Sequence, residues 1–337
     1  MIDISQALEF FEERHDTSLL PYSIVTDSDN LGPHLIIVGA THGNETVGVR
    51  AIMDYITHLE SNTIKLKKGK ITWILGNPEA FREGKRFLHM NMNRAFNALL
   101  DDHTEHQRVR EIRRYFNHVS SESNLDLLID LHSVSIGDFK IAICLSDKPD
   151  NYSRLNSLTA LQSRFTCTDA QLPGSFMQEA EDFGGFGMAL ECGNHTDPES
   201  SHTALWHINK ALIEYDMIHQ QDLLNVAPLP QPESIIRFEC IEPIKPDYDF
   251  EWLIPLEDVH TGSKLRRGQT YASYRGGAHT APEDCVLFVP DPKPHPEDID
   301  AGFIANLSVT IPEFYPSEST KTVASKRKQN HTIHQPK

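Results

Sequence analysis

Short apolar segments alternate with amphipathic segments over the first 220 residues, and this alternation restricts the fold more than any other feature of the sequence. Five apolar, β-branched runs predict buried strands at 33–40, 70–78, 125–132, 140–146 and 186–192. Apolar residues at helical spacing predict helices over about 46–60, 105–119 and 199–220. This order of elements predicts an α/β domain with a parallel or mixed sheet flanked by helices.

The chain changes character after a proline-rich break at 225–234, "NVAPLPQPES". Short strand-like pieces separated by Gly, Pro and Asp follow it. They predict a smaller C-terminal β domain over 232–312, after a larger domain over 1–226. The end, 316–337, has few large apolar residues and a basic cluster at 326–328, and we predict a disordered tail there.

Composition excludes several classes of partner. The formal charge of −17 argues against nucleic acid, whose phosphates require clustered Lys and Arg. No apolar run approaches the roughly 20 residues that span a bilayer, and the acidic N-terminus lacks the features of a secretory signal. The five cysteines are widely spaced without a CxxC pair, which argues against a cysteine zinc site or a disulfide framework. We therefore predict a cytoplasmic protein, with a homo-oligomer left open.

Polar residues stand at the ends of four predicted strands. His42 and Asn77 follow the first and second strands, and His132 and Glu191 stand at the ends of the third and fifth. Ligands of open α/β sheets bind beyond the carboxyl ends of the strands. The four residues therefore predict one site at one edge of the sheet.

His42, Glu45 and His132 form a candidate metal site. Catalytic zinc commonly takes three protein ligands, often two His and one carboxylate, and leaves a position for water. Gly43 allows a tight turn between His42 and Glu45. Asp130 lies on the same strand face as His132 and is a candidate acceptor for a ligand's remaining ring N–H. The alternative is a chance HxxE pair in a chain with 18 histidines.

Glu191 is a candidate general base. A carboxylate at the end of an apolar strand, next to a metal-bound water, can take a proton and later deliver it to a leaving amine. The alternative is a glutamate at a strand end that faces solvent.

The segment 76–96 concentrates basic and amide side chains in an otherwise acidic chain. Arginine binds a substrate carboxylate through two hydrogen bonds, and asparagine adds a donor. A solvated basic loop is the alternative, although the interleaved Phe and Met residues favour a partly buried segment. The candidates are Arg82, Lys85, Arg86, Asn93 and Arg94.

Four segments in order carry a resemblance to a known family. They are "GATHGNETVG", "GNPEAFREGKRFLHMNMNRAF", "LIDLHS" and "ALECG". Together they resemble the succinylglutamate desuccinylase/aspartoacylase family of zinc carboxypeptidase-like hydrolases, over about 33–220 and more weakly beyond. The resemblance implies a zinc carboxypeptidase-like α/β domain followed by a β domain that helps to cover the site.

The resemblance also implies roles for individual residues. His42, Glu45 and His132 would bind one zinc ion per chain, and Glu191 would be the catalytic carboxylate. Arg86 would assist the scissile carbonyl, while Asn93 and Arg94 would bind a substrate carboxylate. The segment before Glu191 lacks the second substrate-binding arginine of aspartoacylases. Tyr271 or Tyr274 could be the β-domain tyrosine that contacts substrate in aspartoacylases.

The sequence thus predicts a zinc-dependent hydrolase that cleaves the amide bond of a small N-acyl amino acid, succinylglutamate- or acetylaspartate-like, by metal-activated water. Two alternatives stay open: a carboxypeptidase-like peptidase acting on short peptides, and a non-catalytic module that binds a metal or a small acid. Three N/O ligands also do not exclude cobalt or manganese.

Overall fold

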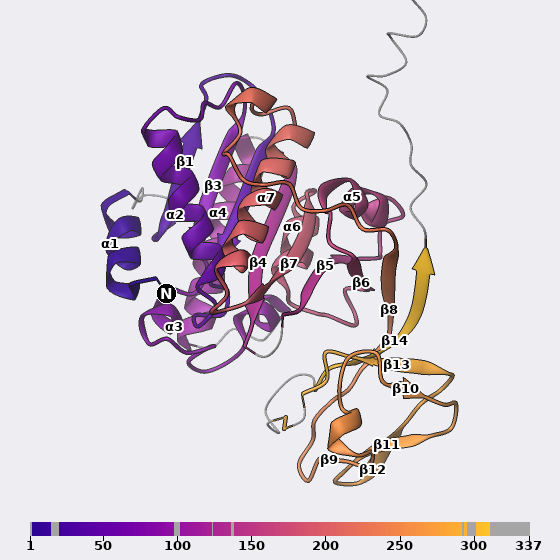
Figure 1. Cartoon of the computed structure of the whole chain (residues 1–337). Coiled ribbons are helices and arrows are strands. Elements are labelled where there is room, and N and C mark those ends of the chain that lie inside the picture. Colours follow the sequence, from indigo (N-terminus) through magenta and orange to yellow (C-terminus); the bar gives the residue numbers. More distant parts are fainter. Residues whose placement is uncertain are drawn as a thin grey trace, which may run out of the picture.

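The computed structural model of the chain describes residues 2–14, 20–97, 102–122, 124–135, 138–291, 293–294 and 301–310. Eleven strands form one mixed sheet in the order β1-β3-β2-β4-β7-β5-β6-β8-β14-β13-β10, and three more form a small sheet in the order β12-β11-β9 (Figure 1). The strands are β1 (Ser23–Asp27), β2 (His34–Gly39), β3 (Lys70–Leu75), β4 (Leu127–Val134), β5 (Lys140–Leu145), β6 (Ser163–Cys167), β7 (Phe186–Asn194), β8 (Ile235–Pro243), β9 (Glu251–Trp252), β10 (Lys264–Leu265), β11 (Thr270–Tyr274), β12 (Gly277–Thr280), β13 (Cys285–Phe288) and β14 (Phe303–Thr310).

Helices cover both faces of the larger part of this sheet. The α-helices are α1 (Ile4–Arg14), α2 (Val47–Glu60), α3 (Pro78–Arg82), α4 (Thr104–Glu122), α5 (Asn151–Leu158), α6 (Phe176–Asp182) and α7 (Pro198–Glu214). The 3-10 helices are η1 (Met92–Asn97), η2 (Gln220–Asp222) and η3 (Leu256–Asp258). None of the helices in the described part of the chain is long and apolar enough to cross a membrane.

The continuous apolar runs arise because the central strands are buried on both faces. In β2, Leu35 and Ile37 pack with α1, α2 and α7, whereas Ile36 and Val38 pack with η1, α4 and α6. Successive residues of a strand point to opposite faces, so a strand between two helical layers needs apolar side chains at every position. The predicted mixed sheet flanked by helices is confirmed.

The five predicted strands correspond to β2, β3, β4, β5 and β7, and the three predicted helices to α2, α4 and α7. Helix α7 ends at Glu214, six residues before the predicted end at 220. Asp216 adopts φ 55° there, while Asp216 N–H and Met217 N–H donate to the carbonyls of Ile213 and Leu212. This arrangement is a Schellman motif, which ends a helix through a left-handed residue.

The topology gathers four strand ends at one edge of the sheet. β2 is parallel to both β3 and β4, and β4 is parallel to β7. Their carboxyl ends therefore lie at the same edge, as predicted for His42, Asn77, His132 and Glu191.

The C-terminal strands continue from this sheet. β8 pairs in parallel with β6 and antiparallel with β14, and the remaining strands lie beyond them, away from the helical layers (Figure 1). A separate apolar cluster around Trp252, Tyr271 and Leu287 fills this region. The domain boundaries at 226 and 232 stay predictions, and the tail at 316–337 lies outside the described residues.

His207 makes the stability of this fold depend on pH. It is fully buried in α7, where Nδ1 contacts the carbonyl of Thr203 at 2.7 Å and Nε2 contacts Thr159 Oγ1 at 2.9 Å. Burial lowers the pKa of His207 to about 4. The unfolded chain, whose histidine has an ordinary pKa near 6.5, therefore binds more protons than the folded chain between those values, and acidification favours unfolding.

We expect His207 alone to remove about 2 kcal/mol of folding free energy between pH 7 and pH 5. Urea unfolding of the native chain and of a His207→Gln variant at both pH values measures this contribution. The variant should have a lower free energy of unfolding than the native chain at pH 7, but this free energy should fall less between pH 7 and pH 5. An equal loss in both proteins would mean that His207 does not titrate as described.

Candidate active site

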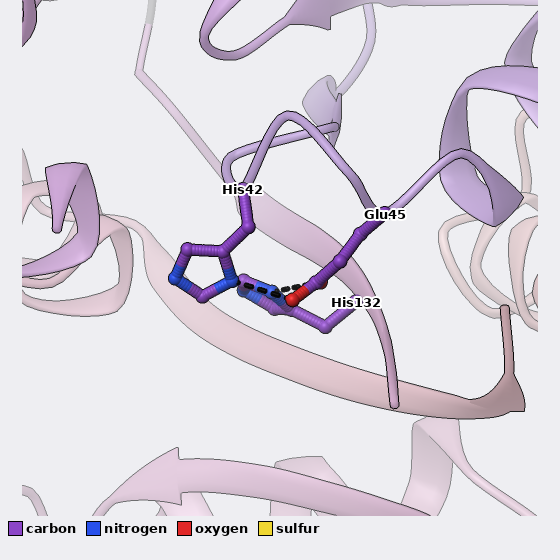
Figure 2. A group of neighbouring side chains, drawn as sticks. All are labelled: His42, Glu45 and His132. Atoms are coloured by element: carbon purple, nitrogen blue, oxygen red, sulfur yellow. Dashed lines mark hydrogen bonds and ion pairs between the residues drawn. The ribbon is translucent and has the colours of Figure 1, made fainter. Parts of the chain in front are cut away.

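His42, Glu45 and His132 meet at the carboxyl edge of the sheet (Figure 2). His42 follows β2, Glu45 directly precedes the first turn of α2, and His132 lies near the end of β4. Their exposed fractions are only 5%, 2% and 3%. One donor atom from each lies within 4.8 Å of the others, so the three side chains could hold a metal ion.

The turn between His42 and Glu45 is fixed by a close backbone approach. A Cβ at Gly43 would lie 2.2 Å from the carbonyl carbon of Ala80 and 2.3 Å from Phe81 N in α3. Gly43 N–H also donates to the carbonyl of Arg86 at 3.0 Å. Gly43 has no positive φ, so the glycine is needed for space rather than for the tight turn that the sequence suggested.

The Glu45 carboxylate lies between the two imidazole rings (Figure 2). Its Oε1 lies 2.7 Å from His42 Nδ1 and accepts from Arg86 Nη1 at 3.0 Å. Its Oε2 lies 2.9 Å from His132 Nδ1 and accepts from Ser133 N–H at 3.1 Å. Although burial acts to raise the pKa of Glu45, the two histidines hold it well below its usual range. Glu45 is therefore a buried carboxylate anion.

His132 is enclosed by carboxylates. Its Nε2 lies 2.7 Å from Asp130 Oδ2, and Asp130 Oδ1 accepts from Thr41 Oγ1 at 2.6 Å. Burial opposes the charge on His132, but Asp130 and Glu45 together raise its pKa well above the usual value. The contact between Asp130 and the ring of His132 is the one predicted from the sequence. It fixes the ring so that Nδ1 points toward Glu45.

The contacts of His42 fit a cation at this site. Asn91 Oδ1 accepts from Asn93 N–H at 3.0 Å, and the same oxygen lies 3.0 Å from His42 Nε2. His42 Nε2 therefore carries the proton. Burial, followed by the charge of Arg86, lowers the pKa of His42 to about 4, so its Nδ1 is an unprotonated acceptor. Two acceptors, Nδ1 and Glu45 Oε1, then face each other, and a metal ion between them would satisfy both.

Glu191 lies beside this group on the neighbouring strand. It is the direct partner of His132 in the parallel pairing of β4 and β7, so both side chains emerge on the same face. Its Oε2 is shielded from solvent and has no hydrogen-bond partner in the described part of the protein. Burial and then the negative charge of Glu45 raise the pKa of Glu191 to about 7. A carboxylate with such a pKa can both take and return a proton near neutral pH.

Arg86 and Asn93 lie near the histidines, and Arg94 follows Asn93 in the chain. Arg86 is about half exposed, and its guanidinium reaches Glu45. Asn93 accepts from Phe176 N–H through Oδ1, while its Nδ2 lies 3.4 Å from His132 Nε2. Because His132 Nε2 donates to Asp130, the Asn93 amide makes no true hydrogen bond there. Arg94 Nη1 donates to the Asn93 carbonyl at 2.7 Å.

Other candidates from the sequence lie elsewhere. Arg82 pairs with Glu79, and Lys85 pairs with Glu83, both at the surface. Asn77 caps α3 by accepting from Ala80 N–H and donates to Glu105. These contacts give all three a structural explanation.

Among the described residues, the contacts of both candidate tyrosines lie in the C-terminal region and not at the histidine–glutamate group. Tyr271 is fully buried in the C-terminal apolar cluster, with ring contacts to Trp252 and His279. Tyr274 packs against the same His279, with ring centroids 4.9 Å apart.

Sequence reasoning missed two residues that contact the group and a third, His195, that contacts one of these two. Asn91 orients His42, and Ser133 N–H binds Glu45. His195 Nδ1 lies 2.8 Å from Ser133 Oγ. Asn91 stands two residues before the Asn-Arg pair and His195 four residues after Glu191. Proximity to those motifs was the only available signal.

The sequence is similar to those of known proteins of one family. The sequence profile of the succinylglutamate desuccinylase/aspartoacylase catalytic domain matches residues 31–207. A succinylglutamate desuccinylase of Pseudomonas paraeruginosa is 32% identical over 109 residues, which cover 32% of each chain. A probable aspartoacylase of Acaryochloris marina is 24% identical over 217 residues, covering 62% of this chain and 70% of that protein.

The fold has been observed in solved structures. The crystal structure of a succinylglutamate desuccinylase from Chromobacterium violaceum matches with a TM-score of 0.64 and 18% identity. The match covers 92% of this chain and 98% of that one. By contrast, the sequence alignment spans about a third of the Pseudomonas desuccinylase. The zinc carboxypeptidase-like fold is thus shared over nearly the whole length, whereas close sequence similarity is confined to part of it.

Proposed function

Because the chain belongs to the succinylglutamate desuccinylase/aspartoacylase family of hydrolases, we propose that it is a zinc-dependent amidohydrolase acting on a small N-acyl amino acid. The observation that carries this proposal is the buried His42–Glu45–His132 group with the unpartnered Oε2 of Glu191 beside it. A non-catalytic module that only binds a metal has no use for a carboxyl group with a raised pKa at that position.

The donor set suits zinc. Two imidazoles and one carboxylate are a common set for a catalytic site, and they leave a position for water or substrate. Zinc bound there supplies a Lewis acid that polarises the scissile carbonyl and acidifies a water molecule. Asp130 contacts Nε2 of His132, and Asn91 contacts Nε2 of His42. These contacts orient the two imidazoles so that both Nδ1 atoms face Glu45.

Each remaining residue has a separate task in this proposal. Glu191 takes a proton from the attacking water and gives it to the departing amine. The guanidinium of Arg86 stabilises the negative charge that develops on the carbonyl oxygen. Asn93 and Arg94 bind the carboxylate of the amino acid. They so orient the amide over the metal group, which is formed by the side chains of His42, Glu45 and His132. One zinc per chain, a cytoplasmic location and the absence of nucleic-acid or membrane partners are the accompanying predictions.

Hydrolysis assays with zinc-loaded protein test the proposed reaction. N-acetyl and N-succinyl derivatives of aspartate and glutamate are compared with dipeptides that have the same C-terminal residue. Release of the free amino acid from an N-acyl derivative is the expected result. Turnover of dipeptides alone would favour a carboxypeptidase-like peptidase, and turnover of none of them would contradict the proposal.

Replacing Arg86 by methionine should lower kcat about 10²-fold, which is the usual effect of losing one group that stabilises a developing oxyanion. The zinc content should stay at the native value because Arg86 is not among the three ligands. Lys85→Met is the matched control, since the neighbouring Lys85 pairs with Glu83 at the surface. Steady-state kinetics and elemental analysis of both variants make the comparison. A variant with native kcat would remove Arg86 from the mechanism.

A further inference from the structure

The loop between α3 and η1 carries two residues that contact the metal group. It spans residues 83–91, all of which the structure describes, and contains no helix or strand. Arg86 Nη1 donates to Glu45 Oε1 at 3.0 Å, and Asn91 Oδ1 lies 3.0 Å from His42 Nε2. Loops are ordinarily more mobile than the elements that they connect. These two contacts therefore depend on whatever holds the loop in place.

A buried carboxylate in the first turn of α4 binds the middle of this loop. Glu105 is fully buried, and its Oε1 accepts from Leu88 N–H at 2.7 Å and from Asn77 Nδ2 at 3.3 Å. Its Oε2 accepts from His89 N–H at 3.2 Å. These three hydrogen bonds satisfy both oxygens of the buried carboxyl group. All three donors lie in the segment 77–89, so the carboxylate binds the loop and its approach rather than its own helix.

The two bound amides lie between the side chains that reach the metal group. Leu88 stands two residues after Arg86, and His89 stands two residues before Asn91. Two residues of extended chain span at most about 7 Å. A displacement of the backbone at Leu88 and His89 is therefore passed on to both Arg86 and Asn91.

The helix that provides this carboxylate is itself fastened to the sheet edge. Arg108, one turn after Glu105, is 4% exposed and donates through Nη2 to the carbonyl of Leu75 at 2.8 Å. Its Nε donates to the carbonyl of Gly76 at 2.9 Å. Leu75 is the last residue of β3, the strand that lies parallel to β2. The start of α4 thus links the sheet edge with the loop.

We propose that Glu105 is a positioning residue that holds Arg86 at Glu45 and Asn91 at His42. This role rests on the proposed function, which gives Arg86 and the metal group their tasks. Glu105 acts through the backbone of the loop, because its three donors belong to the segment 77–89 and not to the metal group.

Hydrogen exchange of the metal-free protein tests the contacts of Glu105. Glu105→Gln keeps the size of the side chain but replaces one acceptor oxygen by an amide NH₂ group, which cannot accept from a backbone N–H. The amides of Leu88 and His89 should exchange about 10-fold faster in the variant, whereas the amides of β4 should exchange as in the native chain. Glu79→Gln is the control, since Glu79 pairs with Arg82 at the surface of α3.

Zinc affinity, measured by competition with a chelator, tests the effect on the metal group. Glu105→Gln should weaken zinc binding about 10-fold, because losing a contact that orients a metal ligand has effects on that scale. Asn91→Ala should also weaken it, and adding Glu105→Gln to that variant should cause little further loss, since both substitutions break one chain of contacts. His207→Gln, which lowers stability within α7, should bind zinc like the native chain.

Turnover at saturating zinc provides a second cycle. Glu105→Gln should lower kcat about 10- to 100-fold, because misplacing a group near the reacting atoms by about 1 Å costs on that scale. Combining it with Arg86→Met should lower kcat no further than Arg86→Met alone. Glu105→Asp keeps the charge but is one methylene shorter, so it should lie between the native chain and Glu105→Gln in all three measurements.

The outcomes separate this role from the proposed reaction. If no amide is hydrolysed but exchange and zinc affinity respond as described, the proposed reaction fails and the positioning role stands. Native zinc affinity and kcat in a folded Glu105→Gln variant would overturn the role, as would undiminished losses in the Asn91→Ala and Arg86→Met backgrounds. Equal weakening in His207→Gln would also overturn it, because general instability would then be the cause. If Glu105→Gln does not fold, the same cycles with Glu105→Asp decide by the same criteria.

Discussion

Glu191→Gln should lower kcat by about 10²- to 10⁴-fold while the protein keeps its zinc, because general acid–base catalysis contributes on that scale. Glutamine has nearly the shape of glutamate but can neither accept the proton of the attacking water nor deliver one to the amine. Glu191 is not among the three residues whose donor atoms converge, so metal binding should not depend on it. The loss should therefore appear in turnover rather than in metal content.

The surroundings of Glu191 explain why the effect should be large. Burial and the nearby charge of Glu45 raise its pKa to about 7. Its Oε2 has no hydrogen-bond partner in the described part of the chain, so no described protein group competes for this oxygen with the proton that it would accept. Pairing with His132 across adjacent strands fixes its distance from the metal group. A base on a strand that pairs with the strand of His132 loses little in orientation when substrate binds.

The pH profile adds a second expectation for Glu191. The base acts only when it is deprotonated, so kcat/KM should rise with pH through its pKa and level off above it. A bound cation favours the charged carboxylate, which places this acidic limb below the value of about 7 that burial and Glu45 produce. The limb should disappear from the residual activity of Glu191→Gln.

Glu214→Gln is the control for this substitution, because Glu214 lies at the exposed end of α7 and pairs with Lys210. Both variants are compared by steady-state kinetics and by elemental analysis. Near-native turnover of Glu191→Gln with bound zinc would contradict the assigned mechanism. Loss of zinc from that variant would instead assign Glu191 a role in holding the metal.

The sequence predicted the central strands because their burial is symmetrical. β2 reads "HLIIVG" and is apolar at every position from Leu35 to Val38, since helices cover both of its faces. β6 was missed because it reads "SRFTC", with Arg164 at its second position. Arg164 is 1% exposed and donates to Asn156 and to the carbonyls of Ser163 and Thr159. Tertiary hydrogen bonds of this kind leave no periodic signal.

The candidate site, too, contains contacts that the sequence predicted and contacts that it did not. His42 and Glu45 share one turn, and Asp130 and His132 share one strand face, so local spacing was sufficient to group them in two pairs. Asn91 reaches His42 only because the loop after α3 is held against Gly43. His195 reaches Ser133 only through a bulge in the pairing of β4 with β7, where Gly193 adopts φ +117°. Such contacts depend on the conformation of one glycine or on a hydrogen bond between two backbone segments. Composition and periodicity carry no signal of either.

His132→Ala should abolish zinc binding and, with it, all hydrolysis. It removes one of the three donors that converge in the described part of the chain, and two ligands do not form a site that retains zinc against dilution. His132 also has both ring nitrogens next to carboxylates, Glu45 at 2.9 Å and Asp130 at 2.7 Å. Its loss leaves Asp130 buried with Thr41 as its remaining side-chain partner, which costs folding free energy as well.

Asp130→Asn separates the two effects of that substitution. Asparagine keeps the volume and the contact to the ring of His132 but removes the charge that orients and polarises it. Loss of such an outer contact typically weakens metal binding by about 10- to 100-fold, without abolishing it. Zinc content by elemental analysis, zinc affinity by competition with a chelator, and thermal unfolding of both variants distinguish a missing ligand from a damaged fold.

A graded result supports the assignment of the ligands: one zinc per native chain, weakened binding in Asp130→Asn and none in a folded His132→Ala. If His132→Ala folds and still retains one tightly bound zinc, the third ligand lies elsewhere. The proposed mechanism then fails, because it requires the metal to lie at His132, beside Glu191. The comparison is decisive because Asp130 acts on the metal only through the imidazole of His132. An effect of Asp130→Asn that persisted in the His132→Ala background would therefore reveal a structural role instead.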